Sequence, residues 1–170
     1  MVKSAVINKL RKKEFMFRII VFSDTHRHVW PAIDQIEKIG SVDMIIHLGD
    51  MASDVEDIRS AYPGIRLESV CGNNDFAFGQ VYEKVVKAEG HLIFMCHGHT
   101  RGVKFETESL LSEAREKNCG AALYGHTHIE VCEKRDGIYL MNPGSVRYSG
   151  TYGIIEIEDG RLSACILPLA

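Results

Sequence analysis

Seven side chains that can ligate a metal ion stand in five short polar clusters, each of which directly follows an apolar run. In the segment LYGHTH, for example, His126 and His128 lie one residue apart at the end of such a run. A single histidine pair of this kind is more often a surface feature of a turn, so the prediction depends on all seven residues together. Imidazole, carboxylate and amide donors without a thiolate suit Mn, Fe, Ni, Co or Zn rather than Ca or Mg. The sequence therefore predicts a transition-metal site with these ligands: Asp24, His26, Asp50, Asn73, His97, His126 and His128.

The number of ligands predicts two metal ions. One zinc-like ion takes about three or four protein ligands, so seven ligands suit two ions that share a carboxylate. Asp50 is the expected bridge, because its carboxylate has two oxygens and Gly49 before it lets the backbone turn close to the ions. Two ions roughly 3.5–4 Å apart clamp the attacking and departing oxygens of a phosphoryl displacement, and they lower the pKa of a coordinated water from about 15.7 to near 7. The expected nucleophile is a hydroxide that bridges the metals.

The elements that must position these ligands can be predicted from the periodicity of the apolar residues. The five runs are short and rich in Ile, Val, Leu and Phe, as expected for strands that are buried on both faces. Helical spacing predicts helices over 29–39, 55–61 and 107–119, the second of them capped by Ser53 or Asp54. Ligands of open α/β sheets bind at the carboxyl ends of the strands, which is where all five clusters are expected.

Antiparallel hairpins are predicted in the second half of the chain. Residues 81–96 are expected to turn at Glu89 and Gly90, and two later pairs of β-runs each surround an Asp-Gly dipeptide, which is a strong hairpin signal. Alternating strands and helices followed by hairpins predict an α/β fold of two packed sheets with helices outside.

Length and charge predict a single domain over residues 16–170 that is preceded by a basic extension. The formal net charge is −3, and five cations against one Glu give residues 1–15 a net of +4, so the remainder carries −7. An acidic body argues against binding long nucleic acids, which requires clustered Lys and Arg. We expect residues 1–15 to be a flexible extension, with a short amphipathic helix for targeting or for a membrane surface as the alternative.

The five cysteines have no C-x-x-C spacing and are interpreted as buried thiols of a reducing compartment. No apolar stretch approaches the length of a membrane span, and no segment resembles a signal peptide. The expected location is the cytoplasm.

Five motifs in order resemble the calcineurin-like metallophosphoesterases. They are D-T-H at 24–26, G-D at 49–50, G-N-N-D at 72–75, H-G-H at 97–99 and G-H-T-H at 125–128. The resemblance is closest to the small bacterial and archaeal phosphodiesterase branch, which also includes the retromer subunit Vps29, and it extends to N-P-G-S at 142–145. It implies a four-layer double β-sandwich of two mixed sheets flanked by helices, with two divalent ions, manganese expected first. The implied first ion is held by Asp24, His26 and His128, the second by Asn73, His97 and His126, with Asp50 between them.

The expected catalytic residues are Asp50, Asn74 and His99. Larger members of the family have a histidine that acts as an acid where this chain has Asn74, and an amide can donate a hydrogen bond but cannot deliver a proton. His99 is expected to contact the phosphate or a metal ligand, with an ordinary loop histidine as the alternative. Arg101 and Arg147 are candidates for phosphate contacts or are solvated loop residues.

The function that these residues predict is a metal-dependent phosphodiesterase for small substrates, including nucleotide-like ones. The first alternative is a protein-binding scaffold like Vps29, which four convergent imidazoles argue against. The second is a phosphomonoesterase or a nuclease that uses the same site. Phe76 and Phe78 predict an apolar wall for a leaving group, a contact within a homo-oligomer, or ordinary core packing.

Overall fold

The computed structural model describes residues 16–76 and 80–170 and contains two five-stranded sheets. The first sheet has the order β10-β9-β1-β2-β3 and the second the order β4-β5-β6-β8-β7. The strands of the first sheet are β1 (Phe17–Phe22), β2 (Met44–His47), β3 (Arg66–Ser69), β9 (Thr151–Glu158) and β10 (Arg161–Pro168). The strands of the second are β4 (Glu83–Ala88), β5 (His91–Cys96), β6 (Ala121–Leu123), β7 (Val131–Arg135) and β8 (Ile138–Asn142).

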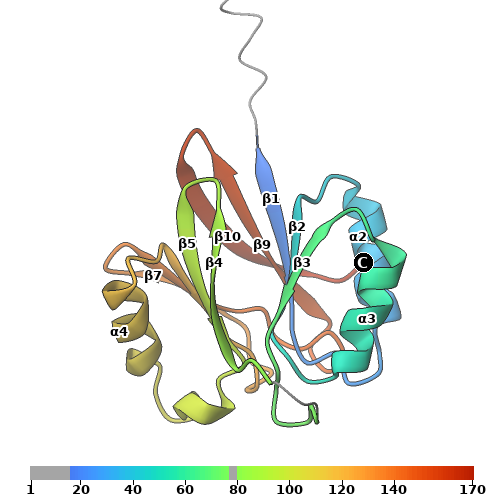
Figure 1. Ribbon diagram of the computed structural model, residues 1–170, viewed down its shortest axis with the longest axis horizontal. Helices are drawn as coiled ribbons and strands as arrows, with labels where there is room; N and C mark the ends of the chain where they lie inside the picture. The colour runs from blue at the N-terminus through green and yellow to red at the C-terminus, as the bar shows by residue number, and fades with distance from the viewer. Residues whose placement is uncertain (1–15, 77–79) are drawn as a thin grey trace, which may run out of the picture.

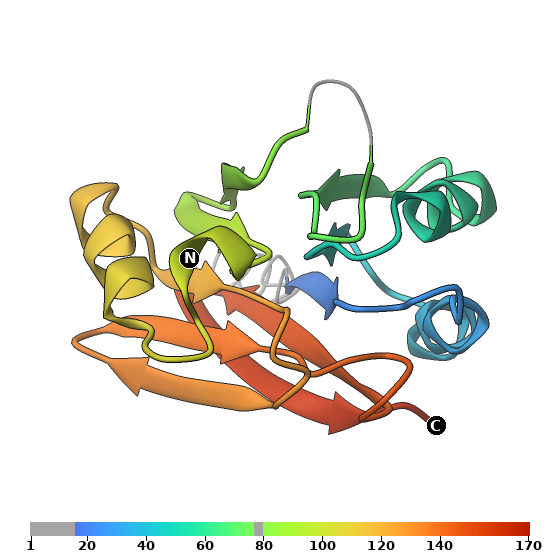
Figure 2. The same cartoon turned by 90° about the horizontal axis from the view of Figure 1, so that it is seen from below.

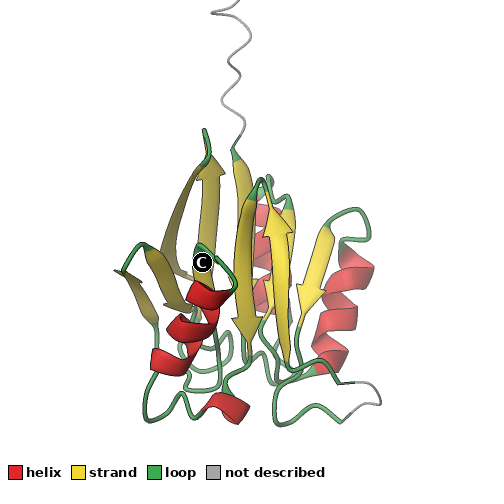
Figure 3. Ribbon diagram, turned by 60° about the vertical axis from the view of Figure 1, so that its left-hand side comes forward, coloured by secondary structure: helices red, strands yellow, loops and turns green. Residues whose placement is uncertain are grey.

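Helices lie on the outside of this sandwich (Figure 1). The helices α2 (Trp30–Ile39) and α3 (Ala52–Ala61) flank the first sheet, whereas α4 (Glu108–Glu116) packs on β5, β6 and β8 of the second. A short 3₁₀ helix, η1 (His99–Arg101), follows β5. Figure 3 shows the same helices on the two outer sides of the strands. The predicted four-layer arrangement of two mixed sheets and flanking helices is confirmed.

Strand periodicity explains why the sheets are covered on both faces. In β1, Ile19 and Val21 point into the core between the two sheets, whereas Ile20 and Phe22 point into the core under α2 and α3. All four side chains are fully buried, as the uninterrupted apolar run predicts. Burial of each such side chain stabilises the fold by roughly 1.5–3 kcal/mol. A third core lies between α4 and the second sheet.

Parallel pairing brings the carboxyl ends of six strands to one edge of the sandwich. Strands β1, β2 and β3 run parallel to one another, as do β5, β6 and β8. The loops after these strands are joined across the two sheets: the backbone N–H of His126, after β6, donates to the carboxylate of Asp24, after β1, at 3.0 Å. Figure 2 shows the molecule from below, where these loops gather. The five predicted clusters therefore share one edge.

The three predicted hairpins are confirmed. Strands β4 and β5 turn at Glu89 and Gly90, and β7–β8 and β9–β10 turn at Asp136-Gly137 and Asp159-Gly160. In each turn both central residues have positive φ, which is the type I′ geometry that Asp-Gly favours.

Two helix boundaries differ from the prediction by more than one residue. Helix α3 begins at Ala52 rather than at 55, and neither Ser53 nor Asp54 is its cap, because both lie within the first turn. The first N–H groups are instead bound by the carboxylate of Asp75, which is distant in sequence. Helix α4 ends at Glu116, three residues before the predicted end.

The prediction that all the cysteines are buried is wrong for two of them. Cys96 and Cys119 are buried and Cys71 is half-buried, but Cys132 and Cys165 are exposed, because they occupy outward positions on the edge strands β7 and β10. All five thiols are free. The predicted extension over 1–15 and Phe78 lie outside the described residues. Within the described ranges, every helix is too short or too polar to span a bilayer.

Candidate metal centre

Left-handed backbone conformations place most of the predicted ligands. The φ angles of Asp24 and His26 are 54° and 44°, that of Asp50 is 64°, and those of His126 and His128 are 67° and 59°. Such conformations cost an L residue of order 1–3 kcal/mol each and persist where surrounding contacts enforce them. Five residues in this conformation at one edge of the sheets indicate a functional site, because the fold maintains their positions despite the cost in stability.

Close packing of the loops also requires glycine. Gly49 has a φ of 100°, and a Cβ atom there would lie 2.6 Å from the backbone nitrogen of Gly72. A Cβ at Gly72 would overlap the Asp50 carboxylate. Because Gly49 and Gly72 have no Cβ atom, the loops after β2 and β3 can approach closely. This approach brings Asp50 beside Asn73 and Asn74.

The first group of converging ligands consists of Asp24, His26 and His128. The Nε2 atom of His128 lies 3.0 Å from Oδ1 of Asp24 and 3.4 Å from Nε2 of His26. His26 Nε2 lies 3.8 Å from the same carboxylate oxygen. These three residues, predicted to share one ion, are brought together with their donor atoms facing each other.

Asp24 itself is held rigidly. Its side chain is fully buried, and its Oδ2 atom accepts hydrogen bonds from the Ser23 hydroxyl at 2.5 Å and the backbone N–H of His126 at 3.0 Å. The Ser145 hydroxyl of the N-P-G-S loop donates to its carbonyl at 2.8 Å. Sequence reasoning did not assign roles to Ser23 or Ser145. Oδ1 is thereby left facing the histidines.

The second group contains His97 and Asn73 together with Asp50. His97 Nε2 lies 3.2 Å from the Asn73 amide oxygen and 3.5 Å from Asp50 Oδ1. Asp24 also belongs to this group, since its carboxylate lies within 4.8 Å of the ligand atoms of Asp50 and His97. The structure therefore brings together the donors that were predicted for the second ion, with His126 beside them.

The tautomer of His97 shows that this group suits a cation. Its Nδ1 atom lies 2.8 Å from the carbonyl oxygen of Leu48, which can only accept, so Nδ1 carries the proton. Nε2 is then the ring atom that faces the Asn73 and Asp50 oxygens, so three potential donor atoms converge on one point. A backbone carbonyl on the other ring nitrogen is also the usual partner of a metal-ligating histidine. The residues present therefore fit a metal ion.

His126 completes the second group. Its ring centroid lies 5.1 Å from that of His97. Burial, together with the nearby His97, lowers the pKa of His126 to about 4. The neutral imidazole that results is the form that can bind a metal ion.

Asp50 occupies the position between the two groups. One oxygen, Oδ1, faces His97, while the other, Oδ2, lies 3.7 Å from Nε2 of His26. Asn74 donates to both oxygens, from its backbone N–H at 3.0 Å and from its side-chain amide at 2.8 Å. Burial by itself raises the pKa of Asp50, but the Asn74 hydrogen bonds and His97 outweigh it and lower the pKa below its usual value. A carboxylate that is ionised and faces both groups is what a bridging ligand requires.

His99 lies at the margin of the site. Its ring centroid is 5.4 Å from His97 and 6.2 Å from His126. Its Nδ1 atom is buried and has no hydrogen-bond partner among the described residues. Burial, and then His97, lower the pKa of this imidazole. The position suits the predicted contact with a phosphate or a metal ligand.

Asp75 has a role that sequence reasoning missed. Its Oδ2 atom accepts the backbone N–H groups of Asp50 at 3.0 Å and Gly72 at 2.7 Å, and its Oδ1 atom accepts those of Met51 at 2.9 Å and Ala52 at 2.6 Å. One buried carboxylate thus ties the Asp50 loop to the start of α3. The sequence feature that could have indicated this role is the position of Asp75 at the end of the G-N-N-D motif.

The two candidate arginines differ. Arg101 forms ion pairs with Glu83 and Glu113, which occupy its guanidinium. Arg147 instead lines a cavity beside His26 and donates to the His26 carbonyl at 2.6 Å. Of these two arginines, only Arg147 is therefore positioned for a phosphate contact.

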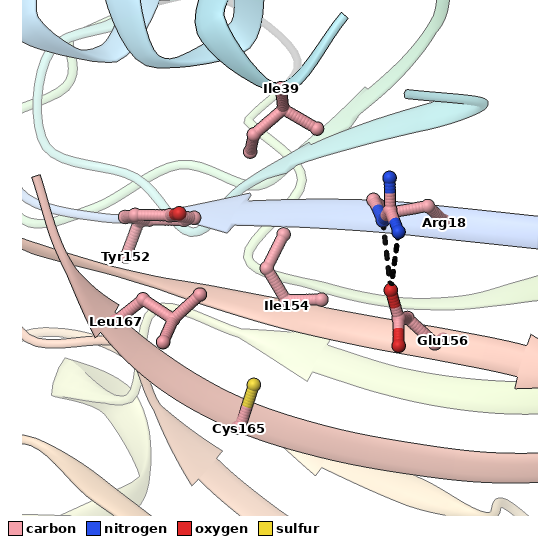
Figure 4. A pocket seen from close by; sticks show the side chains of 7 residues that line it. All are labelled: Arg18, Ile39, Tyr152, Ile154, Glu156, Cys165 and Leu167. Carbon is pink, nitrogen blue, oxygen red and sulfur yellow. Dashed lines mark hydrogen bonds and ion pairs between the residues drawn. The ribbon is translucent and has the colours of Figure 1, made fainter. Parts of the chain in front are cut away.

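A separate cavity of about 400 Å³ lies on the outer face of β9 and β10 (Figure 4). Tyr152, Ile154 and Leu167 line it, and its one guanidinium, Arg18, is paired with Glu156 at 2.7 Å. With an apolar lining and its cation occupied, it is a poor site for a phosphoester.

Comparison with known proteins agrees with this geometry. Residues 17–160 match the calcineurin-like phosphoesterase superfamily domain. A probable metallophosphoesterase of Mycoplasma pneumoniae is 29% identical over 161 residues, covering 87% of this chain and 94% of the relative. A Methanocaldococcus jannaschii protein named as a phosphodiesterase is 25% identical over 175 residues, covering 88% of this chain and 99% of the relative.

Solved structures share the fold. A Streptococcus pneumoniae protein described as a predicted phosphoesterase has a TM-score of 0.75 at 27% identity, covering 91% of this chain and 90% of that one. Vacuolar protein sorting 29 of Cryptosporidium parvum has a TM-score of 0.70 at 15% identity, covering 91% of this chain and 98% of that one, and shows the fold alone. The motifs, the fold and the match over residues 17–160 together show that this chain belongs to the calcineurin-like phosphoesterase superfamily.

Proposed function

We propose that this protein is a phosphodiesterase that acts on small substrates with two divalent transition-metal ions. The observation that carries the proposal is a pair of converging clusters, Asp24 with His26 and His128, and Asp24 with Asp50 and His97; in each cluster the donor atoms lie within 4.8 Å of one another. Asp50 directs one oxygen toward His97 and the other toward His26. Asp24, His26 and His128 would hold the first ion, and Asn73, His97 and His126 would hold the second. Manganese is the first candidate, with Ni, Fe, Co and Zn as alternatives.

The protein's own residues then perform binding and positioning. When bound, the two ions supply the charge that acidifies a water molecule and neutralises phosphate oxygens. Asp50 fixes the positions of the two ligand groups relative to each other. The Asn74 side-chain amide donates to Asp50 at 2.8 Å and lines the cavity that would admit the substrate. His99 is the neighbouring group that can hydrogen-bond a phosphate oxygen. Asn74 cannot transfer a proton to the departing oxygen, so the reaction depends on leaving groups that depart as stable anions.

Two further proposals concern alternatives and location. A protein-binding scaffold has no need of the strained, buried ligand set described above, which disfavours that alternative. We place the protein in the cytoplasm, because five free thiols suit a reducing compartment.

The experiment is metal removal and add-back with paired substrates. Chelated protein receives each metal in turn and is assayed with bis(p-nitrophenyl) phosphate and with p-nitrophenyl phosphate. We expect recovery with about two ions per chain by elemental analysis, and faster release of p-nitrophenolate from the diester. Full activity with one ion per chain would refute the two-metal arrangement, and preference for the monoester would refute diesterase function.

A further inference from the structure

A cavity of about 500 Å³ opens directly beside the first ligand group. Its lining includes the predicted ligand His26 and the catalytic candidate Asn74. A phosphoester held at the metal centre therefore projects one of its substituents into this space. The other lining side chains that bear on its chemistry are Arg27, Phe76, Arg147 and Tyr148.

Two cations of this cavity have no acidic partner. Among the described residues, neither Arg27 nor Arg147 forms an ion pair with a carboxylate, whereas six other arginines do: Arg18, Arg59, Arg66, Arg101, Arg115 and Arg135. Arg147 donates one N–H to the His26 carbonyl, and its guanidinium carbon lies over the Tyr148 ring, 5.5 Å from the ring centroid, on the lining of the cavity. A guanidinium has five donors in a planar fork that matches phosphate. The cavity thus offers two sites for negative charge that the protein itself leaves unmatched.

Two aromatic rings on the same cavity are exposed. Tyr148 stacks on the ligand His128 with ring centroids 5.0 Å apart at an interplanar angle of 16°, yet its side chain remains 62% exposed. Phe76 is 92% exposed. The stack on His128 holds the tyrosine ring beside the metal centre, where a planar group of a ligand can contact the part of the ring that His128 and Arg147 leave exposed. Stacking of a base on an aromatic side chain is worth about 1–3 kcal/mol.

We propose that this cavity is a subsite for a nucleoside that carries a second phosphate, joined through the phosphodiester that the metal centre cleaves. Tyr148 and Phe76 contact the base, and Arg27 and Arg147 contact the second phosphate. The assignment rests on the proposed function only for the position of the scissile phosphate. It makes the two arginines specificity residues that distinguish bisphosphate esters from simple diesters.

The kinetic test uses two substrates with the same leaving group: the 5′-p-nitrophenyl esters of thymidine 5′-phosphate and of thymidine 3′,5′-bisphosphate. Wild-type protein is expected to show kcat/KM about tenfold higher for the bisphosphate ester, the value of one charge-assisted hydrogen-bonded contact. Arg27→Ala and Arg147→Ala each reduce this ratio at least about threefold. Tyr148→Ala lowers both values about tenfold.

Two features make this test specific. Arg147→Ala also removes a bond to the His26 backbone and lowers general activity, so the ratio between substrates is the readout. Arg27→Ala provides the independent variant, since none of the described residues binds its guanidinium. Arg161→Ala is the matched control, because Arg161 begins β10 at the opposite end of the sheet and keeps the wild-type ratio. A wild-type ratio near one, or a ratio that survives both arginine variants, overturns the subsite.

A binding measurement separates this proposal from the proposed function. Calorimetry on metal-free protein in EDTA compares thymidine 3′,5′-bisphosphate with thymidine. Tighter binding of the bisphosphate that Arg27→Ala and Arg147→Ala weaken supports the subsite, even if no diester is hydrolysed by the metal-loaded protein. Equal binding of the two compounds overturns it, even if diester hydrolysis is established.

Discussion

The Asp75 carboxylate is predicted to support both the stability of the fold and the position of Asp50. It accepts four backbone N–H groups, two on each oxygen. In Asp75→Asn one oxygen becomes an amide NH₂, so two of the four N–H groups lose their acceptor and face another donor. Turning the amide over only changes which two are lost.

The cost follows from the number of unmatched donors. An unsatisfied buried donor costs roughly 1–3 kcal/mol. The amide is expected to turn its NH₂ toward Met51 and Ala52, whose N–H groups are only part-buried, so the two lost acceptors cost about 2 kcal/mol, and loss of the negative charge weakens the remaining pair. A free energy of unfolding is typically only about 5–15 kcal/mol. We therefore expect Asp75→Asn to lose a large share of the stability, together with activity, because the backbone of Asp50 is one of the four donors.

The assay is urea unfolding of chelated protein followed by far-UV circular dichroism, since bound metal would add its own stabilisation. Asp57→Asn is the matched control, because it makes the same chemical change on an exposed position of α3 and is expected to stay within about 0.5 kcal/mol of wild type. If Asp75→Asn unfolds within about 1 kcal/mol of wild type, the carboxylate is not the main support of this loop.

Three other outcomes are expected. Asp50→Asn should lower kcat/KM by on the order of 10³ or more, and by more than His26→Ala, because it weakens both ligand groups; a loss of only a few fold would exclude Asp50 as the bridge. Asn74→His should flatten the dependence of rate on leaving-group pKa across substituted phenyl diesters, since general acid assistance is worth about 10²–10⁴ fold; a shallow wild-type slope would point to another proton donor. Burial lowers the pKa of His47 from 6.5 to about 4, so the unfolded chain binds a proton that the native state does not, and stability should fall by about 2–3 kcal/mol as the pH drops from 7 to 4.5. In urea unfolding of His47→Gln at both pH values, the loss of stability between pH 7 and pH 4.5 should be smaller by this amount. A variant that loses as much stability as wild type would contradict the assignment to His47.

The sequence by itself determined the elements and the ligand types. Short uninterrupted apolar runs and dipeptides such as Asp136-Gly137 depend on local sterics and on burial of a strand's faces, so hairpins and strand ends could be predicted from neighbouring residues. The ligand set followed because each donor stands directly after a strand. Parallel strands end at one edge, and so Asp24, Asp50 and His97 were expected to meet.

The tertiary structure alone decided how these groups are held. The start of α3 depends on Asp75 from a different loop, and the tautomer of His97 depends on the carbonyl of Leu48. Tertiary structure also decided which candidate arginine is free of ion pairs. Arg101 and Arg147 are equivalent candidates in the sequence, but of the two only Arg101 pairs with carboxylates, those of Glu83 and Glu113. These contacts join residues that are far apart along the chain, and local propensity carries no information about which distant group will be within hydrogen-bonding distance.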